Sequence, residues 1–227
     1  MPRTGSARRP SARAGATRQA LVQAAVDVLR HEGFSAATAR TIAARAGCNQ
    51  GLVFYYFGSV VDLLLAALDE VSDQRRRRYE AALAAVGGLS DLVGLAAQIF
   101  SEDLRSGDAA LLVEMIAGAT STPGLGAAVK SRLAPWTQFA ATALEPLASR
   151  SPLAGLVGPD EIAHAMVALY LGLELVSHLD GNSAPALALF ERARGLAPLL
   201  EMAGLWLGKD SLRAGKDSTP TPMKERS

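Results

Sequence analysis

Apolar residues recur every three or four positions along most of the chain, which is the spacing of amphipathic helices. Between residues 17 and 31, one such face holds Leu21, Ala24, Ala25, Val28 and Leu29. No segment alternates apolar and polar residues as a half-buried strand does. The pattern therefore predicts an all-α protein, with further helices at about 59–85, 90–105, 108–119, 122–149, 160–179 and 185–207.

Residues 38–64, TARTIAARAGCNQGLVFYYFGSVVDLL, carry the most specific signal. Thr38 is placed to cap a short helix, which Gly47 ends because glycine adopts the left-handed conformation at little cost. Asn49 is placed to cap a second short helix that reaches Phe57, and Ser59 is placed to cap a third. Two short helices that cross through a tight turn form a helix-turn-helix, whose second helix fits the major groove of DNA. This stretch predicts a DNA-binding protein.

The same stretch resembles the tetracycline-repressor (TetR) family. The resemblance rests on the motif Ile-Ala-x-x-Ala-Gly, a small N-cap residue, Gly51, an aromatic run ending at Phe57, and then Ser59 with Leu63 and Leu64. It implies an N-terminal three-helix helix-turn-helix DNA-binding domain joined to a C-terminal helical ligand-binding and dimerisation domain. The corresponding boundaries are 1–16 for a disordered basic arm, 17–64 for the DNA-binding domain, 65–208 for the helical regulatory and dimerisation domain, and 209–227 for a flexible tail.

The resemblance places the DNA-reading residues on the second short helix. Gln50 is expected to pair with an adenine edge and Leu52 to pack against a thymine methyl group. The full set expected at the DNA is Thr38, Arg40, Asn49, Gln50, Gly51, Leu52, Tyr55 and Tyr56. Two positions depart from the family, because Phe54 stands where tyrosine is frequent and Val60 stands where lysine is usual. Phe54 and Phe57 are expected in the core.

Charge is divided unevenly along the chain. Residues 1–58 hold eight arginines and two acidic residues, a net charge of +6, whereas the remainder holds 15 basic and 20 acidic residues, a net charge of −5. A polyanion such as DNA is therefore attracted to the N-terminal part alone. The arm at residues 1–16 either contacts phosphates or a minor groove, or serves only as a solubilising tail. The run Arg75 to Arg78 is expected to form a solvated face, because Asp73 and Glu80 lie at intrahelical ion-pair spacing.

The last two expected helices bear on oligomerisation. The helix at 160–179 is apolar on both sides, so one side can face its own domain and the other needs a partner. The TetR resemblance implies that these two helices pair with their copies across a twofold axis, as a palindromic DNA site requires. The alternative is a monomeric bundle that the two helices close. The residues expected at the dimer interface are Val167, Leu171, Leu175, Leu189, Leu196 and Leu200.

The helical domain mixes glycines with scattered aromatic residues, a composition that can enclose an apolar pocket. The residues expected to contact a small, mostly apolar effector are Phe100, Met115, Trp136, Phe139, Tyr170 and Glu174, with Gln98 and Glu114 as further polar candidates. The predicted function is a DNA-binding transcriptional regulator, a repressor that binds a palindromic operator as a homodimer and is released by this effector. The alternative is a ligand-independent DNA-binding or architectural protein.

An enzyme is not expected, and neither is a cofactor or a metal. Glu161 and His164 have the spacing of half a di-iron motif, but the other half is missing. Glu174 and His178 have half-site spacing for zinc and are expected to form an ordinary polar pair instead. The single cysteine, Cys48, excludes an internal disulfide and suits a cytoplasmic protein. The longest uncharged stretch, at 46–61, has 16 residues, so no membrane-spanning helix is expected.

Overall fold

The computed structural model describes residues 9–148 and 158–214, and in these ranges the chain forms helices and no strands. The predicted all-α class is confirmed. The helices are α1 (Arg9–His31), α2 (Ala39–Arg45), α3 (Gly51–Phe57), α4 (Val60–Ala84), α5 (Leu89–Ser106), α6 (Asp108–Ala119), α7 (Leu125–Ala148), α8 (Pro159–Asp180) and α9 (Ala184–Ala214).

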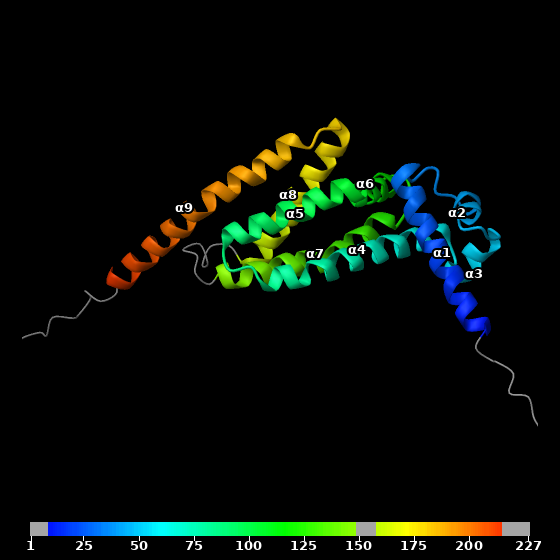
Figure 1. Cartoon of the computed structure of the whole chain (residues 1–227), viewed down its shortest axis with the longest axis horizontal. Helices are drawn as coiled ribbons and strands as arrows, with labels where there is room; N and C mark the ends of the chain where they lie inside the picture. Colours follow the sequence, from blue (N-terminus) through cyan, green and yellow to red (C-terminus); the bar gives the residue numbers. More distant parts are fainter. Residues whose placement is uncertain (1–8, 149–157, 215–227) are drawn as a thin grey trace, which may run out of the picture.

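The molecule is elongated, with α1, α2 and α3 gathered at one end and α4 to α7 running along its length (Figure 1). Helix α9 lies along α5, and α8 lies along α7. Helix α4 belongs to both parts of the molecule, because it begins directly after α3 and continues for 25 residues beside α5, α6 and α7. The expected boundary at residues 64 and 65 therefore falls inside a continuous helix.

One hydrophobic core joins the two parts. Its fully buried members come from α1, α2, α3, α4, α6 and α7, and they include Leu21, Leu29, Ile42, Val53, Leu64, Leu111, Met115 and Leu125. Two smaller clusters fill the far end of the helical domain, around Leu92 and Leu144 and around Tyr79 and Ile99. The DNA-binding end is thus packed against the helical domain rather than tethered to it.

Several expected helix bounds are wrong. Helix α1 begins at Arg9 instead of residue 17, because the segment is rich in alanine and arginine, both good helix formers, and Pro10 is tolerated in a first turn. Thr17 lies inside this helix, and its hydroxyl donates a hydrogen bond to the carbonyl of Arg13. Helix α9 continues to Ala214, six residues into the expected tail. Residues 1–8 and 215–227 of the expected arm and tail lie outside the described residues.

The middle of the chain differs in one further respect. Helix α7 begins at Leu125, after Gly124 with φ +79°, rather than at the Thr122-Pro123 pair. Helix α7 continues through Pro135 to Ala148. Packing against α8 and α4 offsets the hydrogen bond that proline removes.

Helix α8 is, by length and composition, apolar enough to cross a membrane, contrary to the expectation from uncharged stretches. Its two sides differ. One side packs on α7 and carries the buried polar residues Glu174 and Ser177, and the other exposes leucine and valine. The buried polar groups mark α8 as a helix of the domain with one unpartnered apolar face.

A glycine at the junction of the two parts generates the first prediction. A Cβ added at Gly118 of α6 would lie 2.5–2.6 Å from the ring of Phe34, so Gly118→Ala must displace that ring. We expect a loss of about 1–3 kcal/mol in the free energy of unfolding, measured by urea denaturation at fixed protein concentration.

Gly126→Ala is the matched control, because a Cβ there meets only the Ala119 methyl, at 3.8 Å. It should be neutral or should stabilise the exposed helix position by up to about 1 kcal/mol. Equal destabilisation by both substitutions would contradict the proposed close packing of Phe34.

Candidate functional site

The helix-turn-helix forms as its capping residues predict. The hydroxyl of Thr38 accepts a hydrogen bond from the amide of Thr41 at 3.2 Å, and Gly47 adopts φ +65° directly after the first helix. The hydroxyl of Ser59 accepts from the amide of Asp62 at 3.0 Å. The side chain of Asn49 accepts from the amide of Gly51 at 2.8 Å, although Gln50 rather than Asn49 occupies the N-cap position.

These caps hold α3 at the surface, at the tip of the elongated molecule (Figure 1). Of the residues expected at DNA, those that are exposed are Thr38, Arg40, Asn49, Gln50, Gly51 and Tyr55. Leu52 and Tyr56 are half-buried and pack against the core, so less of each remains for DNA. The expected core position of Phe54 is wrong, because 53% of this residue is exposed and Val53 fills the buried side of the helix instead.

The cations around α3 are not equivalent. Arg45 forms an ion pair with Glu32 at 2.5 Å, which offsets its charge. Arg40 is exposed and forms no ion pair with another described residue. Arg18 of α1 lies over the ring of Phe57 at 5.0 Å, which brings a cation to the end of α3. The sequence gives no sign of the Arg18 contact, because 39 positions separate the two residues.

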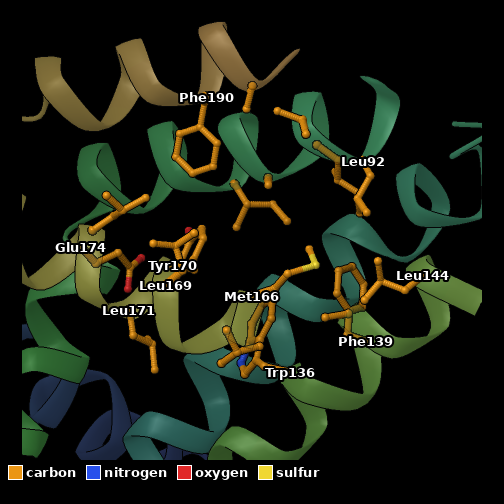
Figure 2. A pocket seen from close by; sticks show the side chains of 18 of the residues that line it. Leu92, Trp136, Phe139, Leu144, Met166, Leu169, Tyr170, Leu171, Glu174 and Phe190 are labelled. Atoms are coloured by element: carbon orange, nitrogen blue, oxygen red, sulfur yellow. The ribbon is translucent and has the colours of Figure 1, made fainter. Parts of the chain in front are cut away.

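A cavity of about 390 Å³ lies in the helical domain and is lined by residues of α4 to α9 (Figure 2). Its lining is almost entirely apolar. Four of the six residues expected to contact an effector line it, namely Trp136, Phe139, Tyr170 and Glu174. The other two do not, because Phe100 is fully buried behind the wall, against Tyr170 and Phe190, and Met115 belongs to the core at the DNA-binding end.

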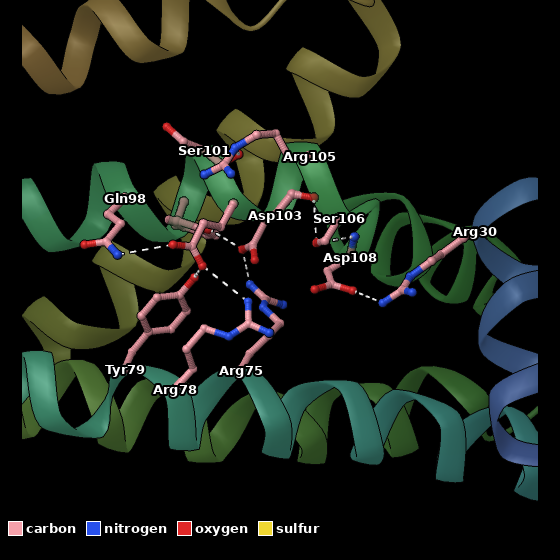
Figure 3. A network of polar contacts seen from close by, with 12 residues as sticks. Arg30, Arg75, Arg78, Tyr79, Gln98, Ser101, Asp103, Arg105, Ser106 and Asp108 are labelled. Atoms are coloured by element: carbon pink, nitrogen blue, oxygen red, sulfur yellow. Dashed lines mark hydrogen bonds and ion pairs between the residues drawn. The ribbon is translucent and has the colours of Figure 1, made fainter. Parts of the chain in front are cut away.

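The polar side of this cavity is a buried network that joins three helices (Figure 3). Arg75 of α4 donates to Asp103 of α5, and the hydroxyl of Tyr170 of α8 donates to the same carboxylate. The guanidinium of Arg75 also lies over the ring of Trp136 at 4.7 Å. Arg75 is only 7% exposed, so the expected solvated face is wrong for this residue.

The neighbouring arginines do lie among ion pairs near the surface. Arg76 pairs with Asp73 and Glu80, and Arg78 pairs with Glu102 of α5. Arg75 differs because its position on α4 points toward α5 and α7, where an unpaired cation would be costly. The run of four arginines in the sequence does not distinguish them.

Glu174 is the least satisfied polar residue of the cavity wall. It is 1% exposed, and its Oε1 atom has no hydrogen-bond partner among the described residues. Burial, and then the neighbouring charge of Asp103, raise the pKa of Glu174 to about 8. Burial is the largest single influence and lowers the pKa of Arg75. The charges of Asp103, Glu174, Tyr170 and Asp108 together outweigh it and raise the pKa, so Arg75 stays a cation. Burial also raises the pKa of Asp103, although the charge of Arg75 opposes this, so the two carboxyl groups together hold a proton at neutral pH.

Helix α6 connects the cavity to the DNA-binding end. Its Leu112 lines the cavity, while Asp108 accepts a hydrogen bond from Arg30 of α1. The carboxylate of Glu114 accepts from the amide of Phe34 at 2.7 Å. Glu114 is therefore an interdomain contact rather than a polar anchor of the cavity.

The residues expected at the dimer interface fall into two groups. Val167, Leu171 and Leu189 line the cavity, although Leu189 is also 45% exposed. Leu175, Leu189, Leu196 and Leu200 are 40–61% exposed. Further exposed apolar residues of α8 and α9 that the sequence reading did not select are Leu169, Val176, Leu179, Leu199 and Met202.

The polar pairs considered for metal binding separate in the structure. Glu161 accepts from the amide of Gly158 at 2.9 Å and so caps α8, and His164 is exposed. The expected Glu174–His178 pair is wrong, because Glu174 faces the cavity and His178 is exposed. Within the described part of the chain, no cluster of three histidine, cysteine or acidic side chains is placed to hold a metal ion.

Comparison with known proteins supports the assignment of a helix-turn-helix module. Residues 21–67 match the model of the tetR family of bacterial regulatory proteins. Among curated proteins, none matches the sequence.

Solved structures share the fold over most of their length. A TetR-family transcriptional regulator from Rhodococcus sp. has a TM-score of 0.67 at 20% identity, with 80% of this chain and 98% of that chain covered. The regulatory protein TetR from Rhodobacter sphaeroides has a TM-score of 0.65 at 21% identity, covering 79% and 97%. FadR from Bacillus subtilis, solved in complex with stearoyl-CoA, has a TM-score of 0.62 at 17% identity, covering 78% and 96%.

The buried carboxyl group generates a prediction about stability. Because folding raises the pKa of Glu174 to about 8, the folded state holds a proton that the unfolded state releases. The free energy of unfolding should therefore fall as pH rises from the usual glutamate range to about 8, by at most about 1.4 kcal/mol per pH unit. Glu174→Gln cannot bind this proton. The free energy of unfolding of the variant minus that of the natural protein should therefore increase as the pH rises over the same range.

The measurement is urea denaturation of both proteins at several pH values. Glu145→Gln is the control, because Glu145 is exposed on α7 and the substitution removes the same carboxyl group at the surface. A flat difference for Glu174→Gln would show that its carboxyl group titrates normally in the folded protein.

Proposed function

We propose that the chain is a TetR-family transcriptional regulator, a cytoplasmic repressor that is released from DNA by a small, mostly apolar effector. The match of residues 21–67 to the tetR family model and the shared fold support this proposal. In this proposal a homodimer binds a palindromic operator. The observation that carries the proposal is the apolar cavity of about 390 Å³, whose wall includes α4, the helix that leads directly from α3.

Operator binding is assigned to α3. Its exposed side presents Gln50, Gly51 and Tyr55 to a major groove, with Arg40 at the start of the preceding helix for a phosphate or a guanine. Helix α3 itself carries no charged residue, so attraction to the phosphates comes from the surrounding arginines. Arg18 joins Arg40 in this role, because its cation lies beside Phe57 at the end of α3.

Dimerisation is assigned to the outer faces of α8 and α9. On α8, Leu169, Val176 and Leu179 follow one another at helical spacing and are 55–72% exposed. The intervening Gly172 is exposed and has open space beside it, which allows a second helix to approach closely. Monomeric proteins rarely expose so continuous an apolar face. A twofold pairing buries it and sets the two α3 helices at a fixed separation, which a palindrome needs.

Release is assigned to two helices that connect the cavity with the DNA-binding end. Arg75 and Leu112 place α4 and α6 in the cavity wall. Helix α6 also holds α1 through Asp108 and Glu114. An effector that favours a different placement of α6 or α4 shifts the spacing of the α3 helices, and it acts only through its different affinity for the two arrangements. The coupling typical of such systems is about 1–3 kcal/mol.

Removal of one exposed cation tests the DNA-binding assignment. Arg40→Ala should weaken binding to an operator duplex, taken from upstream of the protein's own gene, by about tenfold at moderate salt. Fluorescence anisotropy over a salt series is the measurement. A phosphate contact lowers the steepness of the salt dependence by about 1, whereas a guanine contact also lowers discrimination against random DNA.

Arg77→Ala is the matched control, since Arg77 is exposed on α4, more than a dozen residues beyond α3, and loses the same charge. Equal weakening by both substitutions would mean that the affinity for DNA depends only on the overall charge of the protein. That result, together with binding abolished by competitor DNA, would favour a ligand-independent architectural protein.

An acidic residue placed on the outer face tests the dimer. Val176→Glu on α8 or Leu200→Glu on α9 should convert the dimer to monomer, because two copies of the new charge would be buried near the twofold axis. Light scattering after size-exclusion chromatography gives the mass. Ile116→Glu is the control, because Ile116 is 41% exposed on α6, away from the proposed interface. Loss of the dimer in the control, or its persistence in both interface variants, would contradict the assignment.

A further inference from the structure

The polar end of the cavity differs from its apolar walls in having one unused hydrogen-bonding atom on a carboxyl group. Oε1 of Glu174 has no partner among the described residues, although the residue is 1% exposed. A buried acceptor without a partner destabilises the folded protein, so its presence on a cavity wall points to a ligand that satisfies it. Figure 2 shows the Glu174 carboxyl group beside Tyr170 on that wall.

Counting the buried charges restricts the ligand further. Without a ligand, the cation of Arg75 is balanced by Asp103, and Glu174 carries a proton. A ligand carboxylate would leave this cluster with a net negative charge, which is costly away from water. A ligand cation can be balanced, because Glu174 can ionise beside it and release its proton to solvent.

The other groups of the cavity are compatible with a bound cation. Arg75 also has an unpartnered donor, Nε, but its charge already lies against Asp103 and over Trp136, so it does not require an anionic ligand. The rings of Phe139 and Phe190 line the same space, and aromatic faces attract cations.

On the basis of the effector site proposed above, we propose that the cavity binds a lipophilic amine, whose apolar body fills the space between α5, α7, α8 and α9 and whose charged N–H group donates to Oε1 of Glu174. The matching carboxylic acid is rejected. The inference rests on the proposed effector function for its biological meaning, but not for the chemistry of binding.

Binding of an amine should be coupled to pH through Glu174. The ionisable groups that act on it are Asp103 of α5, Arg75 of α4 and Tyr170 of α8, while Asp108 of α6 acts on the first two of these. Arg75 and Tyr170 have raised pKa values, so they do not titrate near neutral pH. Below pH 8, the affinity for an amine should increase as the pH increases, by up to about tenfold per pH unit. Close to one proton should be released per ligand bound.

Three probes with the same apolar body separate the possibilities. They are phenylbutylamine, phenylbutanol and phenylvalerate, which end in a cation, a neutral donor and an anion. Isothermal titration calorimetry in two buffers of different ionisation enthalpy gives both the affinity and the number of protons released. The expected order of affinity is amine, then alcohol, then carboxylate, with proton release for the amine alone.

Two substitutions at Glu174 assign the effect to this residue. Glu174→Gln keeps the shape and one carbonyl acceptor but cannot ionise, so it should weaken the amine at least tenfold and the alcohol by less than about threefold. Glu174→Met removes the acceptor as well and should weaken both. Glu145→Gln, on the exposed side of α7, should leave all three affinities unchanged.

The outcomes distinguish this inference from the proposed function. Tightest binding of the carboxylate, equal binding of all three probes, no binding of any, or an amine preference that survives in Glu174→Gln would overturn the ligand chemistry. Anisotropy of the operator complex with added amine tests the effector role separately. Selective, Glu174-dependent binding that leaves the DNA complex intact would support the site and overturn its role in release.

Discussion

The buried ion pair between Arg75 and Asp103 fixes α4 against α5, and the rest of the helical domain is arranged around it. The same guanidinium lies over Trp136 of α7, and the same carboxylate accepts from Tyr170 of α8. Four helices therefore meet at one charge pair. Removing one partner of such a pair typically costs about 3–5 kcal/mol, because the other charge stays buried. Arg75 also lines the cavity, so that a ligand bound there would lie beside the contact that holds α4.

Placing charge in this position has a consequence for Glu174. A single carboxylate balances Arg75, and the second carboxyl group nearby can then be accommodated only as a neutral acid. This leaves a proton that a cation can displace. The cavity is thus apolar by area but selective through one residue, as is usual for small-molecule sites with few polar groups.

The continuous core physically connects the cavity to the end of the molecule that holds α1, α2 and α3. Met115 of α6 is fully buried among residues of α1 and α4, and Phe34 lies against Gly118. A helix packed this closely moves as a unit rather than deforming. In the proposed mechanism, a shift of α6 at Leu112 in the cavity wall is transmitted to α1, and through α1 to α2, which packs against it.

The sequence by itself determined the helical class, the helix-turn-helix with its caps, and an aromatic-lined pocket containing Trp136, Phe139, Tyr170 and Glu174. These follow from local rules, since capping and helical period depend on residues a few positions apart. Tertiary structure decided which side of α8 faces inward, so that Val167 and Leu171 line the cavity while Val176 and Leu179 face out. A helix apolar on all sides has no period from which to choose. Tertiary structure likewise decided that Arg75 alone of its run is buried, because Asp103 is brought to it from 28 positions away by the packing of α5 on α4.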